Sequence, residues 1–218
     1  MLKIEETIKV FDVVKKTDRD AEIPVLLEFL QKIAPIKSIL DCGSHSSVYN
    51  EYANKIRPLA KRYDGIDIIP DLEAAQILDN FYVGNAINYP LNKYEMIICM
   101  STLEHAGEST YKVDYPYMER ERLFRRCLDL SEKYLWISFP VGQTYTYPNE
   151  LSIIDKHELT KYEGLISGFK VKERFLYSQG PQAGHPWYEH EKRDVALKIP
   201  YIDYVGNCSI CVLEIEKE

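Results

Sequence analysis

The sequence predicts an α/β fold built on a seven-stranded mixed sheet, mostly parallel with an antiparallel last strand, and with helices on both faces. Five strand-like segments alternate with helical patterns, which is typical of parallel strands joined by helical crossovers. Two more strand-like segments end the chain with only an irregular, aromatic stretch between them, which indicates an antiparallel pair. No internal repeat or Gly/Ser linker divides the sequence, so we expect a single domain of residues 1–218.

The first helical pattern lies near the N-terminus, in the segment 1–36 that precedes the sheet. Its apolar residues recur at helical spacing at Ile23, Leu26, Leu27, Leu30 and Ile33. We expect Asp20 to cap this helix, Pro24 to lie in its first turn and Pro35 to end it. Further helical segments are expected at 47–56, 71–78 and 123–128.

The seven expected strands are 38–41, 63–69, 81–84, 94–100, 134–140, 169–177 and 207–216. The segment 94–100 is apolar almost throughout, which is typical of a central strand in a parallel sheet, where both faces are buried. The strand that begins at Tyr63 is closed by Pro70, which cannot donate to a strand ladder.

Composition and charge indicate a folded protein that lacks the basic surface needed to bind duplex nucleic acid. The 218 residues include 45% hydrophobic and 28% charged residues, close to the averages of globular domains. Lys and Arg number 27 and Asp and Glu 34, a net charge of −7, so the basic surface that binds phosphates is lacking. The first residues carry acids where a signal peptide has a basic start, and the apolar runs are too short to span a bilayer. We therefore expect a cytoplasmic protein that binds neither duplex nucleic acid nor a membrane.

The five cysteines, at positions 42, 99, 127, 208 and 211, are odd in number and lie mostly in apolar runs. This pattern favours reduced, buried thiols over a disulfide framework. Cys208 and Cys211 have the spacing of a metal or redox pair, but they fall on an expected strand, where residues three apart face opposite sides. We expect no metal site.

A glycine turn follows the first expected strand of the sheet. The strand 38–41 runs into Cys-Gly-Ser-His-Ser-Ser and a helical segment, and the next strand carries Gly65-Ile-Asp67. A glycine turn lets the backbone approach a ligand, a helix N-terminus favours negative charge, and the carboxylate of Asp67 can accept both hydroxyls of a ribose. The pattern is that of a nucleotide site. The alternative is that Gly43 only makes a tight connection between strand and helix.

From about Lys37 to the C-terminus the sequence resembles the class I S-adenosylmethionine-dependent methyltransferase superfamily. The matching segments are 39–44 at the first motif, 63–67 at the acidic second strand, 84–86 at the adenine-side motif, 94–105 at the fourth strand and its exit, and 139–142 at the end of the fifth strand. The resemblance implies a Rossmann-like sheet, S-adenosyl-L-methionine as the cofactor and methyl transfer as the activity. It divides the domain into the helical segment 1–36, a cofactor-binding half 37–142, and substrate-side loops with the closing strand pair, 143–218.

The resemblance also implies which residues bind the cofactor. The methionine moiety would lie at the acid and glycine turn of Asp41, Gly43 and Ser44, with Asp41 near its amino group. The ribose and adenine would be bound by Asp67, Ile68, Asn85 and Ala86. The end of the fourth strand would line the pocket with Met100, Ser101 and Glu104.

Methyl transfer from a sulfonium is an in-line displacement, so the protein mainly has to align the acceptor and exclude water. A hydroxyl acceptor also has to lose a proton, which requires a base within hydrogen-bond reach. His105, with Glu104 beside it, follows the expected central strand and is the candidate catalytic pair. The alternative is that the two residues only cap the loop at the exit of the strand.

Tyrosines number 17, against seven phenylalanines and two tryptophans, and many follow the expected strands. The Tyr-, Gly- and Pro-rich stretches 112–117, 143–148 and 179–188 are expected to form one mobile rim over the methyl group. Aromatic faces with phenolic hydroxyls suit sugars, so we expect a small or medium polar acceptor, with sugar or glycan-precursor hydroxyls first. Tyrosines serve equally well in half-buried packing or in a dimer surface, which leaves a homo-oligomer open.

Two other functions compete with this interpretation. A nicotinamide-dependent Rossmann oxidoreductase needs a fuller Gly-x-Gly-x-x-Gly and a hydride-transfer site such as Tyr-x-x-x-Lys, and neither stands at a suitable place. A methyltransferase-like binding or regulatory domain without catalysis is compatible with the reduced glycine pattern. In that pattern Gly43 stands alone, and His45 and Ser47 occupy positions where the family often has glycine.

Overall fold

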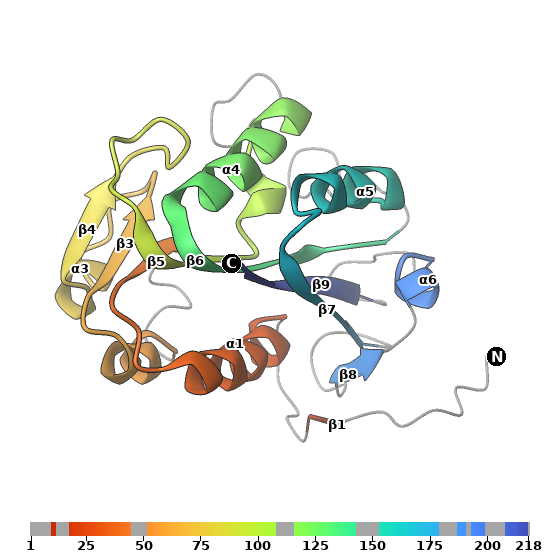
Figure 1. Cartoon of the computed structure of the whole chain (residues 1–218), viewed down its shortest axis with the longest axis horizontal. Helices are drawn as coiled ribbons and strands as arrows, with labels where there is room; N and C mark the ends of the chain where they lie inside the picture. Colours follow the sequence, from red (N-terminus) through yellow and green to blue (C-terminus); the bar gives the residue numbers. More distant parts are fainter. Residues whose placement is uncertain are drawn as a thin grey trace.

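The computed structural model describes residues 10–11, 18–44, 52–107, 116–142, 153–178, 187–190, 193–198 and 208–217. These residues form one sheet of nine strands in the order β1-β8-β7-β9-β6-β5-β2-β3-β4, with helices on both faces (Figure 1). The strands are β1 Val10–Phe11, β2 Ile39–Cys42, β3 Tyr63–Asp67, β4 Asn80–Val83, β5 Tyr94–Met100, β6 Ser131–Pro140, β7 Lys170–Ser178, β8 Trp187–His190 and β9 Cys208–Glu216. The helices are α1 Arg19–Ile33, η1 Arg57–Leu59, α3 Ala74–Ile77, η2 Leu103–His105, α4 Pro116–Leu130, α5 Lys156–Leu165 and α6 Arg193–Ala196.

The predicted mixed sheet is confirmed. Strands β2 to β6 pair in parallel, while β9 runs antiparallel to both of its neighbours, β6 and β7. All seven expected strands are present within the described residues. The sheet also has two short strands that the sequence pattern did not predict, β8 and β1, which extend it beyond β7. Strands of two and four residues are too short to show an alternating pattern of their own.

The central strand β5 is buried because helices cover both of its faces. Met96 and Ile98 belong to the core on the α1 side, and Ile97 and Cys99 belong to the core on the α4 and α5 side. This is the alternation that the period of a strand dictates. Figure 1 shows α1 on one face of the sheet and α4 and α5 on the other. The carboxyl ends of the parallel strands are thereby fixed between two packed layers.

The N-terminal helix α1 begins earlier than the sequence predicts. Asp18, and not Asp20, is the N-cap, because the carboxylate of Asp18 accepts a hydrogen bond from the N–H of Arg19. Pro24 consequently lies inside the helix and not in its first turn. The apolar pattern missed this polar first turn, which places Arg19 near the carboxyl ends of the strands. The helix ends before Pro35, as expected.

The other helices agree with the sequence in part. Residues 52–56 are helical, and the rest of the expected helix 47–56 lies outside the described residues. The helices α3 and α4 confirm the two remaining expected helices, and α4 begins one turn or more before its apolar stripe. Helix α5 was not predicted, although Asp155 caps it by accepting a hydrogen bond from the N–H of Glu158 at 2.8 Å.

The structure also addresses two expectations drawn from composition. Cys42, Cys99, Cys127 and Cys211 are buried and free, which confirms that these four are thiols in the core. Cys211 lies on β9, as its apolar surroundings predict. Among the described residues, no helix combines the length and the apolar character needed to cross a membrane.

Candidate cofactor site

A cavity of about 560 Å³ lies at the carboxyl ends of β2, β3, β4 and β5. The residues that line it are Arg19, Cys42, Gly43, 66–69, 84–87, Ser101, Thr102, 105–107, Glu119 and Leu123. Open α/β sheets bind ligands at this edge, because the loops of several parallel strands meet there. The volume is sufficient for a molecule of nucleotide size.

The glycine turn after β2 is shaped by its neighbour Thr102. Gly43 has a φ of +84°, and a Cβ atom at this position would lie 2.0 Å from Oγ1 of Thr102. The Thr102 hydroxyl lies 3.0 Å from the carbonyl oxygen of Met100 and 3.2 Å from that of Cys42, so it joins the exits of β5 and β2. Only glycine fits this turn, and its backbone lies at the cavity wall.

Asp67 ends β3 at the cavity wall. Its Oδ1 accepts a hydrogen bond from the N–H of Ile69 at 2.9 Å, and its carbonyl oxygen accepts one from the N–H of Gly84 at 2.8 Å. These bonds fix the turn after the strand and therefore the position of the carboxylate. The next residues, Ile68 and Ile69, are 42% and 41% exposed, so they present apolar surface that a ligand in the cavity would cover.

The loop after β4 and the first half of α4 form another part of the cavity wall. Oδ1 of Asn85 accepts a hydrogen bond from the N–H of Ile87 at 2.9 Å, which closes a tight turn. Arg126 of α4 donates to the carbonyl oxygen of Tyr89 at 3.0 Å and holds the loop against the helix. The helix contributes Glu119 and Leu123 to the cavity.

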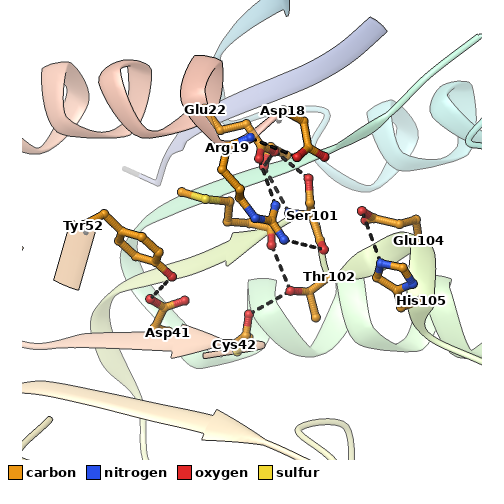
Figure 2. Close-up of polar contacts among 12 residues, drawn as sticks. Asp18, Arg19, Glu22, Asp41, Cys42, Tyr52, Ser101, Thr102, Glu104 and His105 are labelled. Carbon is orange, nitrogen blue, oxygen red and sulfur yellow. Dashed lines mark hydrogen bonds and ion pairs between the residues drawn. The ribbon is translucent and has the colours of Figure 1, made fainter. Parts of the chain in front are cut away.

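A polar cluster joins α1 to the exits of β5 and β6 (Figure 2). Glu22 is fully buried, and its Oε1 accepts hydrogen bonds from the hydroxyls of Ser101 at 2.6 Å and Ser138 at 2.5 Å. Its Oε2 pairs with Nη1 of Arg19 at 2.9 Å, and Nη2 of Arg19 donates to the carbonyl oxygen of Ser101 at 3.3 Å. The buried acid therefore holds a guanidinium group at the cavity wall.

Ser101, the first residue after β5, has an unusual backbone conformation. Its φ is +38°, a backbone angle that residues other than glycine rarely adopt. Its N–H donates to the carbonyl oxygen of Ser138 at 3.1 Å, so the backbone is held on both sides of the strained angle. Strain of this kind persists only where the surrounding structure fixes it, and it concentrates at functional sites.

The predicted catalytic pair lies in η2, directly after Thr102. His105 lines the cavity, whereas Glu104 is 3% exposed and lies behind the wall. Nε2 of His105 is 3.9 Å from Oε1 of Glu104, and Figure 2 shows the two side chains next to each other. Burial raises the pKa of Glu104 to about 7, against the opposing effects of His105 and Arg19. A carboxyl group of this pKa changes its charge near neutral pH.

The structure brings most of the sequence-predicted residues to one cavity. Those at its wall are Gly43, Asp67, Ile68, Asn85, Ala86, Ser101 and His105. Those buried outside the lining are Asp41, Ser44, Met100 and Glu104. Asp41 lies below the glycine turn, where its Oδ2 accepts hydrogen bonds from the hydroxyls of Tyr52 at 3.1 Å and Tyr63 at 2.9 Å.

The sequence pattern missed several residues of this region. They are Arg19, Glu22, Thr102, Glu119 and Leu123. Thr102 adjoins the predicted Ser101, but nothing in the first turn of α1 relates Arg19 to a strand exit 82 positions later.

The expected rim falls largely outside the described residues: 112–115, 143–148 and 179–186. Of its remaining part, 116–117 begins α4 and 187–188 lies on β8, between β1 and β7 in the sheet.

Solved structures that are similar to this chain along most of its length include the following three. A methyltransferase dependent on S-adenosylmethionine from Archaeoglobus fulgidus is 14% identical, with a TM-score of 0.55 over 92% of this chain and 95% of that one. The [4+2]-cyclase SpnF is 12% identical, with a TM-score of 0.55 over 98% and 88% of the two chains. CalS10, an amino pentose methyltransferase from Micromonospora echinaspora, is 9% identical, with a TM-score of 0.50 over 79% and 91%.

Sequence comparison adds no relative to these structures. No protein-family model matches the chain, and no curated protein matches it. At 9% to 14% identity, the structural neighbours establish the fold and not the reaction. The strand order with its antiparallel β9, together with these neighbours, shows that the chain has the Rossmann-like fold of the class I S-adenosylmethionine-dependent methyltransferases.

Proposed function

We propose that the protein binds S-adenosylmethionine in this cavity and transfers its methyl group to a small or medium polar acceptor. The observation that carries the proposal is the convergence of Gly43, Asp67 and the loop 84–87 at one edge of the sheet. The glycine turn suits the methionine part of the ligand, and the carboxylate suits the ribose. The partly apolar end of the cavity suits the adenine. Two structural neighbours named as methyltransferases support the proposal.

The residues of the cavity fit each part of this cofactor. Asp67 would bind the ribose hydroxyls, and the adenine would lie among Ile68, Asn85, Ala86 and Leu123. Arg19 would bind the methionine carboxylate, because Glu22 holds its guanidinium at the wall and the group has further N–H donors. Gly43, which has no side chain, would face the ligand with its backbone.

Three buried residues would act from behind this wall. Asp41, held by two tyrosine hydroxyls, would keep the glycine turn in place and contribute negative charge near the cofactor's amino group. Ser44 packs against Gly65 of β3, since a Cβ atom on Gly65 would lie only 2.4 Å from Oγ of Ser44. Met100 ends β5 just before the strained Ser101.

The bound cofactor supplies an electrophilic methyl group, and the chain has to position the acceptor and remove its proton. His105 lines the cavity at the exit of β5 and would take the proton of an acceptor hydroxyl at an imidazole nitrogen. Glu104, 3.9 Å away and shielded from solvent, would stabilise the imidazolium that forms. A sugar or glycan-precursor hydroxyl is the acceptor we favour, and the amino pentose named for CalS10 supports a sugar-type substrate.

The test is ligand binding followed by turnover. Calorimetric titration with S-adenosylmethionine, S-adenosylhomocysteine and NAD should show binding of the first two and not of NAD. Wild-type protein incubated with S-adenosylmethionine and a panel of sugars and nucleotide sugars should then release S-adenosylhomocysteine. Binding of NAD alone would favour an oxidoreductase. Cofactor binding without turnover on any acceptor would favour a binding or regulatory domain.

A further inference from the structure

Glu104 is a buried carboxyl group beside the cavity whose charge is not fully compensated. The residue is 3% exposed, and within the described part of the chain its Oε2 accepts no hydrogen bond. Nε2 of His105 lies 3.9 Å from the other oxygen, Oε1, which is beyond hydrogen-bond distance. A buried carboxylate with an unused oxygen costs free energy unless a further interaction offsets it.

The arginine of this region is already engaged by another acid. Nη1 of Arg19 pairs with the fully buried Glu22, and Nη2 donates to the carbonyl oxygen of Ser101. In Figure 2 the carboxyl group of Glu104 points toward Ser101 and the Arg19 guanidinium, with the imidazole of His105 beside it. Arg19 is ion-paired with Glu22 and acts on Glu104 only through space, so this wall of the cavity has excess negative charge when both acids are ionised.

We propose that Glu104 is the counter-charge for the sulfonium of S-adenosylmethionine, acting across the wall formed by Ser101, Thr102 and His105. This inference rests on the proposed function, since it assigns a role in binding the cofactor of that reaction. The product, S-adenosylhomocysteine, has a neutral sulfur, so the interaction exists with the cofactor and is lost with the product. Glu104 is thus a positioning residue that makes the site prefer cofactor over product.

The groups that act on Glu104 are Arg19 and Glu22 of α1, His105 of η2, the thiol of Cys99 in β5 and the hydrogen bond from its own backbone N–H. The adjoining helix α4 carries Glu119 at the cavity wall and the buried Arg120, which is paired with Glu158. Burial has the largest effect and raises the pKa of Glu104 to about 7. The carboxyl group is therefore about half ionised at neutral pH, and a cation in the cavity shifts it toward the ionised form.

Binding of the cofactor should consequently release protons. If the sulfonium lowers the pKa of Glu104 by about one unit, binding at pH 7 releases about 0.4 proton per site. S-adenosylhomocysteine releases none from this group. The preference for cofactor over product that Glu104 provides is then about fivefold at pH 7, about tenfold at pH 9 and nearly absent at pH 5.

The experiment is calorimetric titration of both ligands at pH 7 in two buffers of different ionisation enthalpy, PIPES and Tris, which gives the number of protons released. It uses the wild type, Glu104→Gln, and Glu173→Gln as a matched control. Glu173 is a partly buried acid of β7 whose pKa burial also raises, and it does not line the cavity. Wild type and Glu173→Gln should release protons with S-adenosylmethionine only, and Glu104→Gln should release none and lose the fivefold preference.

Three results would overturn the proposal. Equal proton release with both ligands in the wild type contradicts it, and this comparison decides even if Glu104→Gln does not fold. Proton release that persists in a folded Glu104→Gln protein assigns the effect to another group. If the wild type binds neither ligand, the proposed function itself fails, which is distinguishable from binding of both ligands without the expected difference.

Discussion

Arg19 donates a hydrogen bond from Nη2 to the carbonyl oxygen of Ser101 at 3.3 Å, although the two residues lie 82 positions apart. Arg19 begins α1 and Ser101 follows β5, so the bond joins the N-terminal helix to the cavity wall. Glu22 strengthens the connection, because its carboxylate pairs with Arg19 and accepts a hydrogen bond from the Ser101 hydroxyl. The first turn of α1 is therefore structurally part of the candidate site.

Replacement of Arg19 by alanine should weaken S-adenosylhomocysteine binding at least about tenfold, because the ligand carboxylate loses a charge-assisted hydrogen bond of about 1.5–3 kcal/mol. Arg19→Lys should retain part of the affinity. Calorimetry measures both, with Arg125→Ala as the control, since Arg125 is exposed on α4 and pairs only with Glu121 in the described contacts. Unchanged affinity in a folded Arg19→Ala protein would place the ligand carboxylate elsewhere.

Gly43→Ala should destabilise the protein by about 1–3 kcal/mol, because it forces a side chain into a left-handed backbone angle and against Thr102. Urea unfolding measures the loss. Adding Thr102→Ala removes the two nearest atoms, Oγ1 and Cγ2, and should recover part of the stability. If the single variant is as stable as the wild type, the turn does not require glycine.

The sequence predicts well those features that depend on local pattern. The alternation of strands and helices, the glycine turn at Gly43 and the acid that ends β3 can each be recognised from a few adjacent residues. Because carboxyl ends of parallel strands share one edge of the sheet, the topology alone brings Asp67, Asn85 and His105 to one cavity.

Features that depend on tertiary packing could not be predicted in this way. The places of Arg19 and Glu22 follow from how α1 packs across the sheet, and the polar first turn of that helix has no apolar pattern to reveal it. Helix α5 begins with a recognisable cap, Asp155 with Glu158 three residues later. Its apolar residues are too few to form the periodic pattern from which a helix is predicted. The burial of Asp41 behind two tyrosines likewise depends on distant contacts.

The stability of the protein should fall as pH rises through the range set by Glu104. Burial raises its pKa from 4.5 to about 7, so between these values the folded state binds more protons than the unfolded state. The stabilisation from this group is complete below pH 4.5 and is lost as pH rises through 7. Glu104→Gln should therefore gain about 2–3 kcal/mol relative to the wild type between pH 5 and pH 8.

Urea unfolding at pH 5 and pH 8 measures this difference. The control is Glu132→Gln, at an exposed position of β6, which should show no such change between the two pH values. A constant difference between Glu104→Gln and the wild type would mean that Glu104 titrates at its ordinary pKa.

His105→Ala should lower the turnover of a hydroxyl acceptor by about 10²- to 10⁴-fold, the range for loss of a general base. Cofactor affinity should hardly change, because the proposed role of His105 concerns the acceptor proton. Steady-state kinetics with the acceptor found in the sugar panel, together with calorimetry, separates the two effects. A loss of turnover below about tenfold would mean that His105 lines the cavity without acting as the base.

The central claim, that the cavity binds the ribose of S-adenosylmethionine at Asp67, is tested most directly by titrating S-adenosylhomocysteine into three proteins. These are the wild type, Asp67→Ala, and Asp129→Ala, whose exposed acid lies at the far end of α4. The account predicts binding to the wild type and to Asp129→Ala with equal affinity, and a loss of at least about tenfold in Asp67→Ala, from about 1.5–3 kcal/mol of lost hydrogen bonding. Equal affinity in all three proteins, or no binding to the wild type, would contradict it.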